Sequence, residues 1–145
     1  MSTFYTYGKL SQHLLQGEID ILNDTIKCML LTSTSSVEQD TNDVISDLSA
    51  SEVTESGTNY VSGGNTVSNI TISYSASINQ TIVTCDNISW LTASIDAVCA
   101  IVYVEGAQQT NSYCIGYNDF GVTKSCENGE LTIVIDDGLF SMTND

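Results

Sequence analysis

The chain is poor in positive charge. It has no arginine and only three lysines against 18 acidic residues, so its formal net charge at pH 7 is −15. Proteins that bind nucleic acid neutralise phosphates with Lys and Arg, and anionic membranes attract the same side chains. We therefore expect no nucleic acid and no membrane among its partners.

Histidine and tryptophan are each present once. A nucleophile activated by a histidine base requires that histidine, and His13 has no recognisable partner in the sequence, so we expect it to be solvated or part of an interface. The carboxylate pairs Glu18/Asp20 and Asp136/Asp137 could serve glycoside hydrolysis, but with 18 acids some pairs fall close by chance. We predict no enzymatic activity and no catalytic residue.

Paired metal ligands are also missing. The five cysteines contain no C-x-x-C spacing and lie far in sequence from His13, which argues against a zinc site. Most of them lie in apolar runs and are expected to be buried thiols. Acidic loops at Asp119 and residues 135–138 offer oxygen ligands without a 12-residue EF-hand pattern, so calcium is the only cofactor we consider, and none is predicted.

Long apolar runs are absent. The longest, Ala97 to Val104, is about a third of a membrane span. The N-terminus lacks the basic start, apolar stretch and cleavage site of a secretory signal. We expect the protein to be made in the cytoplasm and to stay there or be assembled there.

What is present fits one domain over residues 1–145. With 41% hydrophobic residues a packed core is expected, and abundant Ser, Thr and Asn favour strands and turns over long helices. Residues 1–17 form the predicted N-terminal helical segment, because Phe4, Tyr7, Leu10 and Leu14 recur at steps of three and four and Gly17 is suited to end a helix. Residues 24–32 follow as a buried strand.

Residues 33–59 form a long polar excursion. Val44, Ile45 and Leu48 stand at helical spacing within it, so it should contain a short helix. A loop of this length in a compact domain is usually functional or mobile.

From Tyr60 onward the hydrophobic period is two, as in strands. Asn128-Gly129 is a strong hairpin signal, and beyond it Leu131, Ile133 and Ile135 alternate with polar or exposed positions. The fold class is therefore mainly β: a single antiparallel β-sandwich, or a barrel-like variant, with a short N-terminal helix. The remaining strands are expected in residues 65–76, in 80–92 with a bend at Asp86-Asn87, in 97–104 as a central strand, in 111–121, and in 139–143.

Five motifs follow one another along the chain: GEIDILNDTIKCMLLTS (17–33), ISDL (45–48), AVCAIVYVEG (97–106), YCIGYNDFG (113–121) and NGELTIVIDDGLF (128–140). In this order they resemble a family of small structural proteins of tailed-bacteriophage virions, in which a short N-terminal helix leads through an LNDTIK-type junction into the first strand. The chain departs from that family in two places. Ile135 stands where the family often has tryptophan, and the proline-containing turns of the family are absent here.

The resemblance implies a virion structural protein, located in the virion and assembled in the host cytoplasm. Because packaged DNA repels an acidic protein, we expect it on the outside of the head, as a capsid decoration or cement protein. A head-fibre, neck or tail component is the alternative, and a carbohydrate-binding or adhesion module is a further one. The expected partners are the major capsid protein or other virion subunits, with homo-oligomers likewise expected.

The first candidate interface is the N-terminal segment, because aromatic side chains often dominate the binding energy of interfaces. An alternative stays open at this point, in which Phe4, Tyr5 and Tyr7 cap the core of the sandwich itself. The excursion at 33–59 is the second candidate. The predicted interface residues are Phe4, Tyr5, Tyr7, Leu10 and Leu14.

Overall fold

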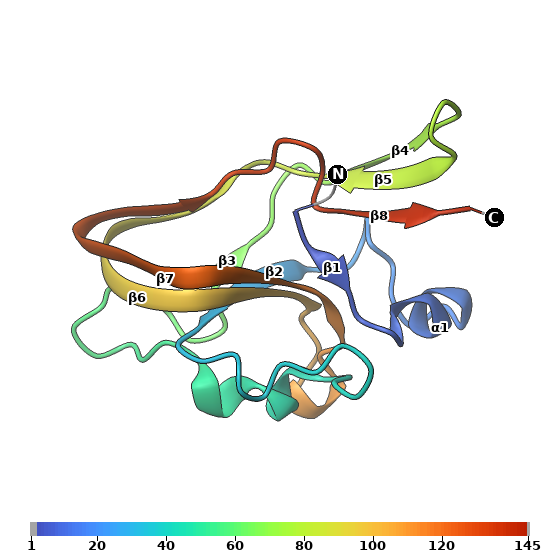
Figure 1. Cartoon of the computed structure of the whole chain (residues 1–145). Coiled ribbons are helices and arrows are strands. Elements are labelled where there is room, and N and C mark those ends of the chain that lie inside the picture. Colours follow the sequence, from blue (N-terminus) through green and yellow to red (C-terminus); the bar gives the residue numbers. More distant parts are fainter. Residues whose placement is uncertain (1–2, 145) are drawn as a thin grey trace.

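Two antiparallel sheets form the framework of the described chain, residues 3–144, in this computed structural model (Figure 1). The five-stranded sheet has the order β1-β7-β6-β2-β3, and the three-stranded sheet has the order β4-β5-β8. The elements are β1 (Tyr5–Thr6), α1 (Leu10–Leu15), β2 (Ile26–Leu31), the 3₁₀ turns η1 (Ile45–Asp47) and η2 (Ser49–Ser51), β3 (Asn65–Thr66), β4 (Thr71–Ser75), β5 (Gln80–Thr84), β6 (Ile88–Val104), η3 (Gln109–Asn111), β7 (Cys114–Ile133) and β8 (Phe140–Thr143). The predicted fold class is confirmed, except that within these residues neither sheet closes into a barrel.

The long strands β6 and β7 pair with each other and form a curved ribbon at the centre of the larger sheet (Figure 1). The half of β6 from Ala97 to Val104 lies between β2 and β7 and is almost entirely buried, which confirms the predicted central strand. Its side chains alternate between two cores, because successive residues of a strand point to opposite faces. Both faces of the sheet are therefore covered along this half of β6.

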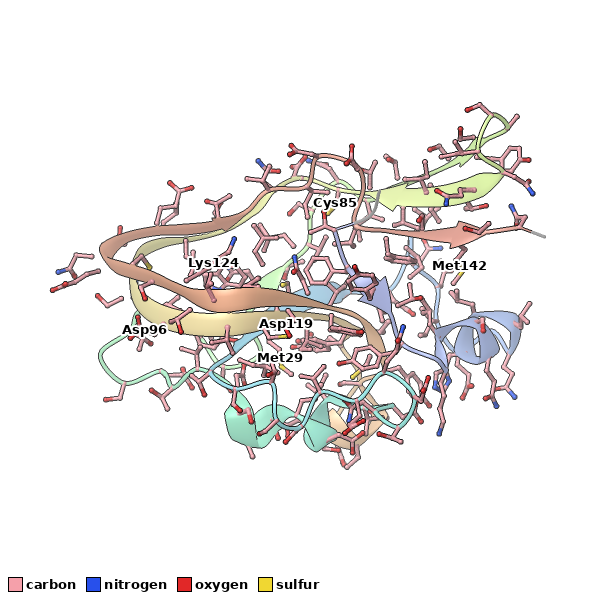
Figure 2. The ribbon with its side chains drawn as sticks, viewed as in Figure 1. Met29, Cys85, Asp96, Asp119, Lys124 and Met142 are labelled. Atoms are coloured by element: carbon pink, nitrogen blue, oxygen red, sulfur yellow. The ribbon has the colours of Figure 1, made fainter. Side chains whose placement is uncertain are left out.

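One face of the sheet is covered by the excursion. Met29, Ile101 and Tyr103 of the sheet pack with Ile45 and Leu48 in a separate apolar cluster. Figure 2 shows Met29 between the ribbon of β6 and β7 and the excursion. The predicted short helix is present as η1 and η2, and it holds the excursion against the sheet by apolar contact.

The predicted N-terminal helix over residues 1–17 is too long. Residues 1 and 2 lie outside the described part, Tyr5 and Thr6 form β1, and only Leu10–Leu15 is helical. The reason is long-range pairing: Tyr5 is opposite Tyr117 and Thr6 is opposite Gly116 in β7. Gly116 admits this neighbour, since a Cβ there would lie 3.0 Å from the carbonyl oxygen of Tyr5.

The predicted hairpin at Asn128-Gly129 is wrong. Both residues lie inside β7, where Gly129 pairs with Ala93 and Cys126 pairs with Ile95. Glu127 and Asn128 of β7 thus lie opposite the single residue Ser94 of β6, which is a bulge that accommodates Asn128 at a φ of 47°. The preference of Asn128-Gly129 for a turn therefore produces a bulge, and β7 continues to pair with β6 on both sides of it. The predicted alternation beyond it is confirmed, since Leu131, Ile133 and Ile135 are buried and Val134 is exposed.

The strand predicted over residues 65–76 is split between the sheets. Its start, β3, pairs with β2, whereas β4 pairs with β5 in the three-stranded sheet. The chain also changes sheet between β5 and β6, at the predicted bend, and Cys85 lies at that crossing (Figure 2). All five cysteines are free thiols: Cys28, Cys99 and Cys114 are buried, and Cys85 and Cys126 are half-buried.

Candidate functional site: a histidine cluster and an uncharged sheet

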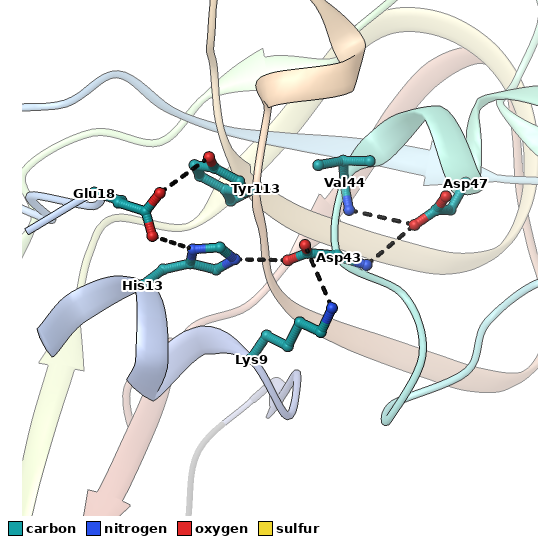
Figure 3. A network of polar contacts seen from close by, with 7 residues as sticks. All are labelled: Lys9, His13, Glu18, Asp43, Val44, Asp47 and Tyr113. Carbon is teal, nitrogen blue, oxygen red and sulfur yellow. Dashed lines mark hydrogen bonds and ion pairs between the residues drawn. The ribbon is translucent and has the colours of Figure 1, made fainter. Parts of the chain in front are cut away.

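His13 lies at the centre of a polar cluster that joins three parts of the chain (Figure 3). Only 7% of the residue is exposed, so of the two positions expected for it, in solvent or in an interface, the one in solvent is wrong. Its Nδ1 is 2.9 Å from Oε1 of Glu18 and its Nε2 is 2.6 Å from Oδ1 of Asp43. The ring stacks on Tyr113 with 3.9 Å between ring centroids. We call Lys9, His13, Glu18, Asp43 and Tyr113 the His13 cluster.

The end of α1 brings Glu18 back to the histidine. Gly17 adopts a φ of +75°, which lets the N–H of Glu18 donate to the carbonyl of His13 and the N–H of Gly17 donate to that of Leu14. This pair of bonds is the Schellman arrangement, for which glycine is the preferred residue. The predicted end of the helix is confirmed, and it serves to place a carboxylate beside the imidazole.

Asp43 reaches the cluster from the excursion. Asp47 accepts hydrogen bonds from the backbone N–H groups of Asp43 and Val44, at 3.1 and 3.3 Å. The carbonyl of Asp43 accepts from the N–H of Cys114, at 2.8 Å. Lys9 lies 3.7 Å from the other carboxylate oxygen of Asp43. The cluster therefore ties α1, the excursion and the start of β7 together.

The charge state of His13 follows from its surroundings. Burial lowers the pKa of His13, but hydrogen bonds to Asp43 and Glu18 outweigh it, so the pKa lies above the ordinary 6.5. In the imidazolium form both ring N–H groups donate to carboxylates, and no lone pair is left to accept a proton. This geometry suits a structural ion-pair clamp and does not suit a general base.

The five predicted interface residues are placed unequally. Phe4, Tyr7 and Leu10 are buried in the chain's own cores, and Leu14 is half-buried against one of them. Tyr5 is 68% exposed, with its ring centroid 5.8 Å from that of Tyr117. Of the five, Tyr5 offers the most free surface, and the alternative in which aromatic residues cap the core describes Phe4 and Tyr7.

A second feature of the fold is a sheet without charge. Residues 56–85 contain no Asp, Glu, Lys, Arg or His, although at 14% charged residues a stretch of this length would carry about four charges. Residues 138–144 are also uncharged. These two stretches supply β4, β5 and β8, which we call the uncharged sheet. The hydrophobic period predicts strands in these stretches but not that they form a sheet of their own, whereas the gap in charge is visible in the sequence.

The uncharged sheet projects from the rest of the molecule (Figure 1). The alternation of residues in β4 is typical of a half-buried strand, but most of its side chains are exposed, including Ile72 at 45% and Tyr74 at 60%. Ile78 in the following turn is exposed as well. This part of the molecule thus exposes apolar side chains to solvent within a stretch that has no charged residue, although the chain as a whole is strongly anionic.

A shallow groove runs between this sheet and α1. Its volume is about 410 Å³, and Leu10, Ser11 and Met142 contribute to its walls. Figure 2 shows Met142 on β8, on the side of the sheet that faces α1. No residue of the His13 cluster lines this groove, so the His13 cluster and the uncharged sheet are separate features.

Neither metal-binding nor membrane-spanning elements are found in residues 3–144. No group of three or more His, Cys, Asp or Glu side chains there is arranged to hold a metal ion. Asp119, a calcium candidate, accepts a hydrogen bond from the N–H of Gly121 at 2.9 Å. No helix of the described residues is long and apolar enough to cross a bilayer.

Comparison of the chain with protein-family models, with curated proteins and with solved structures found no match.

Proposed function

We propose that this protein is a structural component of a tailed-bacteriophage virion that decorates the outside of the head as a cement protein. The observation that carries a binding role is the uncharged sheet, which exposes Ile72 and Tyr74 on an anionic single domain. Exposed apolar side chains that lie next to one another are a feature of protein–protein contact sites, and Ile72 and Tyr74 lie on the same face of β4. The virion assignment itself is supported by the ordered series of motifs from residue 17 to residue 140.

The position outside the head follows from charge. A net charge of −15 opposes contact with packaged DNA, whose phosphates are neutralised by cationic side chains in proteins that bind it. The same charge keeps a protein soluble at the high concentration that many copies per particle require. The proposed partner is the major capsid protein.

Copy number tests this proposal. Virions of the phage that encodes the chain would be purified, and the chain would be quantified against the major capsid protein by gel densitometry and mass spectrometry. A cement protein should approach the stoichiometry of the capsid protein. About a dozen copies or fewer would contradict cement and support a neck, tail or head-fibre part, and absence from the particle would overturn the virion assignment.

A further inference from the structure

Strand β4 is an outer strand whose free edge lacks the usual protection. Its five residues pair in regular register with β5 from Thr71 opposite Thr84 to Ser75 opposite Gln80. Within residues 3–144, β5 is the only strand to which β4 is hydrogen-bonded. Native proteins blunt free edges with lysine, proline, bulges or very short strands, and β4 has none of these.

The other free edges are short, charged or irregular. From Asn118 to Ile133, β7 also lacks a second partner strand, but this segment carries charged side chains and its pairing with β6 shifts register several times. Strands β1 and β3 are two residues long. The carbonyl groups of Gly138 and Leu139, directly before β8, accept hydrogen bonds from the N–H groups of Thr3 and Phe4, at 2.9 and 2.8 Å. Strand β4 is therefore the edge best prepared to add another strand.

Contacts within the chain itself fix the hairpin formed by β4 and β5. The N–H of Asn144 donates to the carbonyl of Asn79 at 2.9 Å, and the side-chain amide of Asn79 donates to the carbonyl of Asn144. The hydroxyl of Tyr74 donates to Oδ1 of Asn79 at 2.8 Å. These contacts fix the turn against the end of β8, which lowers the entropy lost when the edge is covered.

We propose that β4 pairs antiparallel with β4 of a second copy of this chain, so that two uncharged sheets join across a two-fold axis. The distribution of charge is the reason for choosing a second copy as the partner of β4. Two copies at −15 each repel one another, and like charges directly opposite in a sheet are destabilising. Neighbouring strands approach to about 4.8 Å, and the uncharged sheet lets two identical chains come that close without opposing carboxylates.

The sequence of β4 is self-complementary in one register. Full overlap of Thr71–Ser75 with itself places Ser73 opposite the partner's Ser73 and Ile72 opposite the partner's Tyr74. Each of the two Ile–Tyr pairs is an aromatic–β-branched contact of a kind that stabilises sheets. The other face carries only Thr and Ser hydroxyls. A two-fold axis closes this assembly at two copies, whereas pairing of β4 with the partially covered edge beside β8 would not close.

The dimer does not depend on the virion assignment. A strand pair of five residues is small, so we expect a dissociation constant in the micromolar range. The direction in which the dissociation constant changes with salt concentration distinguishes this dimer from other complexes. Because repulsion between the two anionic chains opposes the dimer, added NaCl should strengthen it by screening. Binding of a cationic partner would show the opposite salt dependence.

Analytical ultracentrifugation of the full chain in low and high NaCl tests the proposal. Ser73→Lys should weaken the dimer at least tenfold, because two ammonium groups meet at the axis while the overall charge of each chain becomes less negative. Ser77→Lys is the matched control: the change in charge is the same, the residue is exposed in the turn, and the dissociation constant should stay within about twofold. Circular dichroism checks that each variant is folded.

Oxidative cross-linking tests the register independently. Ser73→Cys should form a covalent dimer across the axis under mild oxidation, and Ser77→Cys should not, with the wild-type chain as the background of its own five cysteines. A chain that stays monomeric at about 1 mM in high salt overturns the proposal. A dimer that is indifferent to Ser73→Lys, or that cross-links equally through position 77, overturns it as well.

Discussion

His13 lies between two carboxylates, which links the charge of one side chain to the stability of the contact between α1 and the excursion. Asp43 and Glu18 face the ring nitrogens, Lys9 lies beside Asp43, and Tyr113 lies on the ring face. The pKa of His13 is raised above 6.5 in the folded chain. A raised pKa contributes stability that is fully present below the unfolded value and is lost as the pH rises through the folded value.

The difference in unfolding free energy between the wild type and His13→Gln should therefore be largest below pH 6.5, the ordinary pKa of histidine, and should shrink as the pH rises through the raised pKa of the folded chain. Hydrogen bonds to charged groups suggest a difference of about 2 kcal/mol at the acidic end. Urea denaturation of both proteins across this range measures it. Since the chain has one histidine, its pKa can also be read from a single set of imidazole NMR signals.

Glu18→Gln provides the control for this prediction. Removing one of the two carboxylates should lower the pKa of His13 and move the loss of stability to lower pH. A histidine pKa at or below 6.5 in the wild type, or a stability difference that grows with pH, would contradict the clamp.

At the scale of elements, the close approach of a loop to a strand sets a strict limit at Gly64. A Cβ built there would lie 1.8 Å from the carbonyl oxygen of Cys28 in β2, and its φ is +79°. This loop leads into β3, which pairs with β2 at Lys27 and Cys28. Any side chain at position 64 would push β3 off the edge of the five-stranded sheet.

Gly64→Ala should accordingly cost about 3 kcal/mol or more in stability, from strain and overpacking together. Gly57→Ala is matched in backbone conformation, with a φ of +74°, but its Cβ would meet nothing within 4 Å. It should cost about 1 kcal/mol. Urea denaturation of both variants measures the difference, and equal losses would show that backbone strain alone, without the contact to β2, sets the cost.

At the scale of the whole molecule, the charge of −15 acts on the folded state through self-repulsion. Between 0.01 and 0.1 M salt the Debye length falls from about 30 to about 10 Å, so repulsion between distant carboxylates is largely screened. The urea midpoint of the monomer should rise over this range. The measurement is made at about 1 μM protein, below the expected dissociation constant of the dimer, and a midpoint that falls or stays constant would contradict the expectation.

The sequence by itself determined which residues are buried in the central strand and at the end of β7, but not in β4, whose alternating side chains are exposed. Alternation at Leu131, Ile133 and Ile135, the apolar run from Ala97 to Val104, and Gly17 at the helix end all hold in the structure. These features are local, since burial of one face and the φ that a turn requires leave their mark on neighbouring residues. The absence of charged residues from 56 to 85 can also be found from the sequence alone, because it requires only a count of charged residues.

Tertiary structure alone decided which segments pair. Helical spacing at residues 4–7 gave way to pairing of Tyr5 with Tyr117, and the turn preference of Asn128 gave way to pairing with β6. His13 meets Asp43 across 30 positions of sequence, and β4 is exposed because nothing in residues 3–144 covers its outer edge. Hydrophobic period shows that a residue faces a core, but the partner strand is selected by packing and hydrogen bonding between segments far apart in the chain.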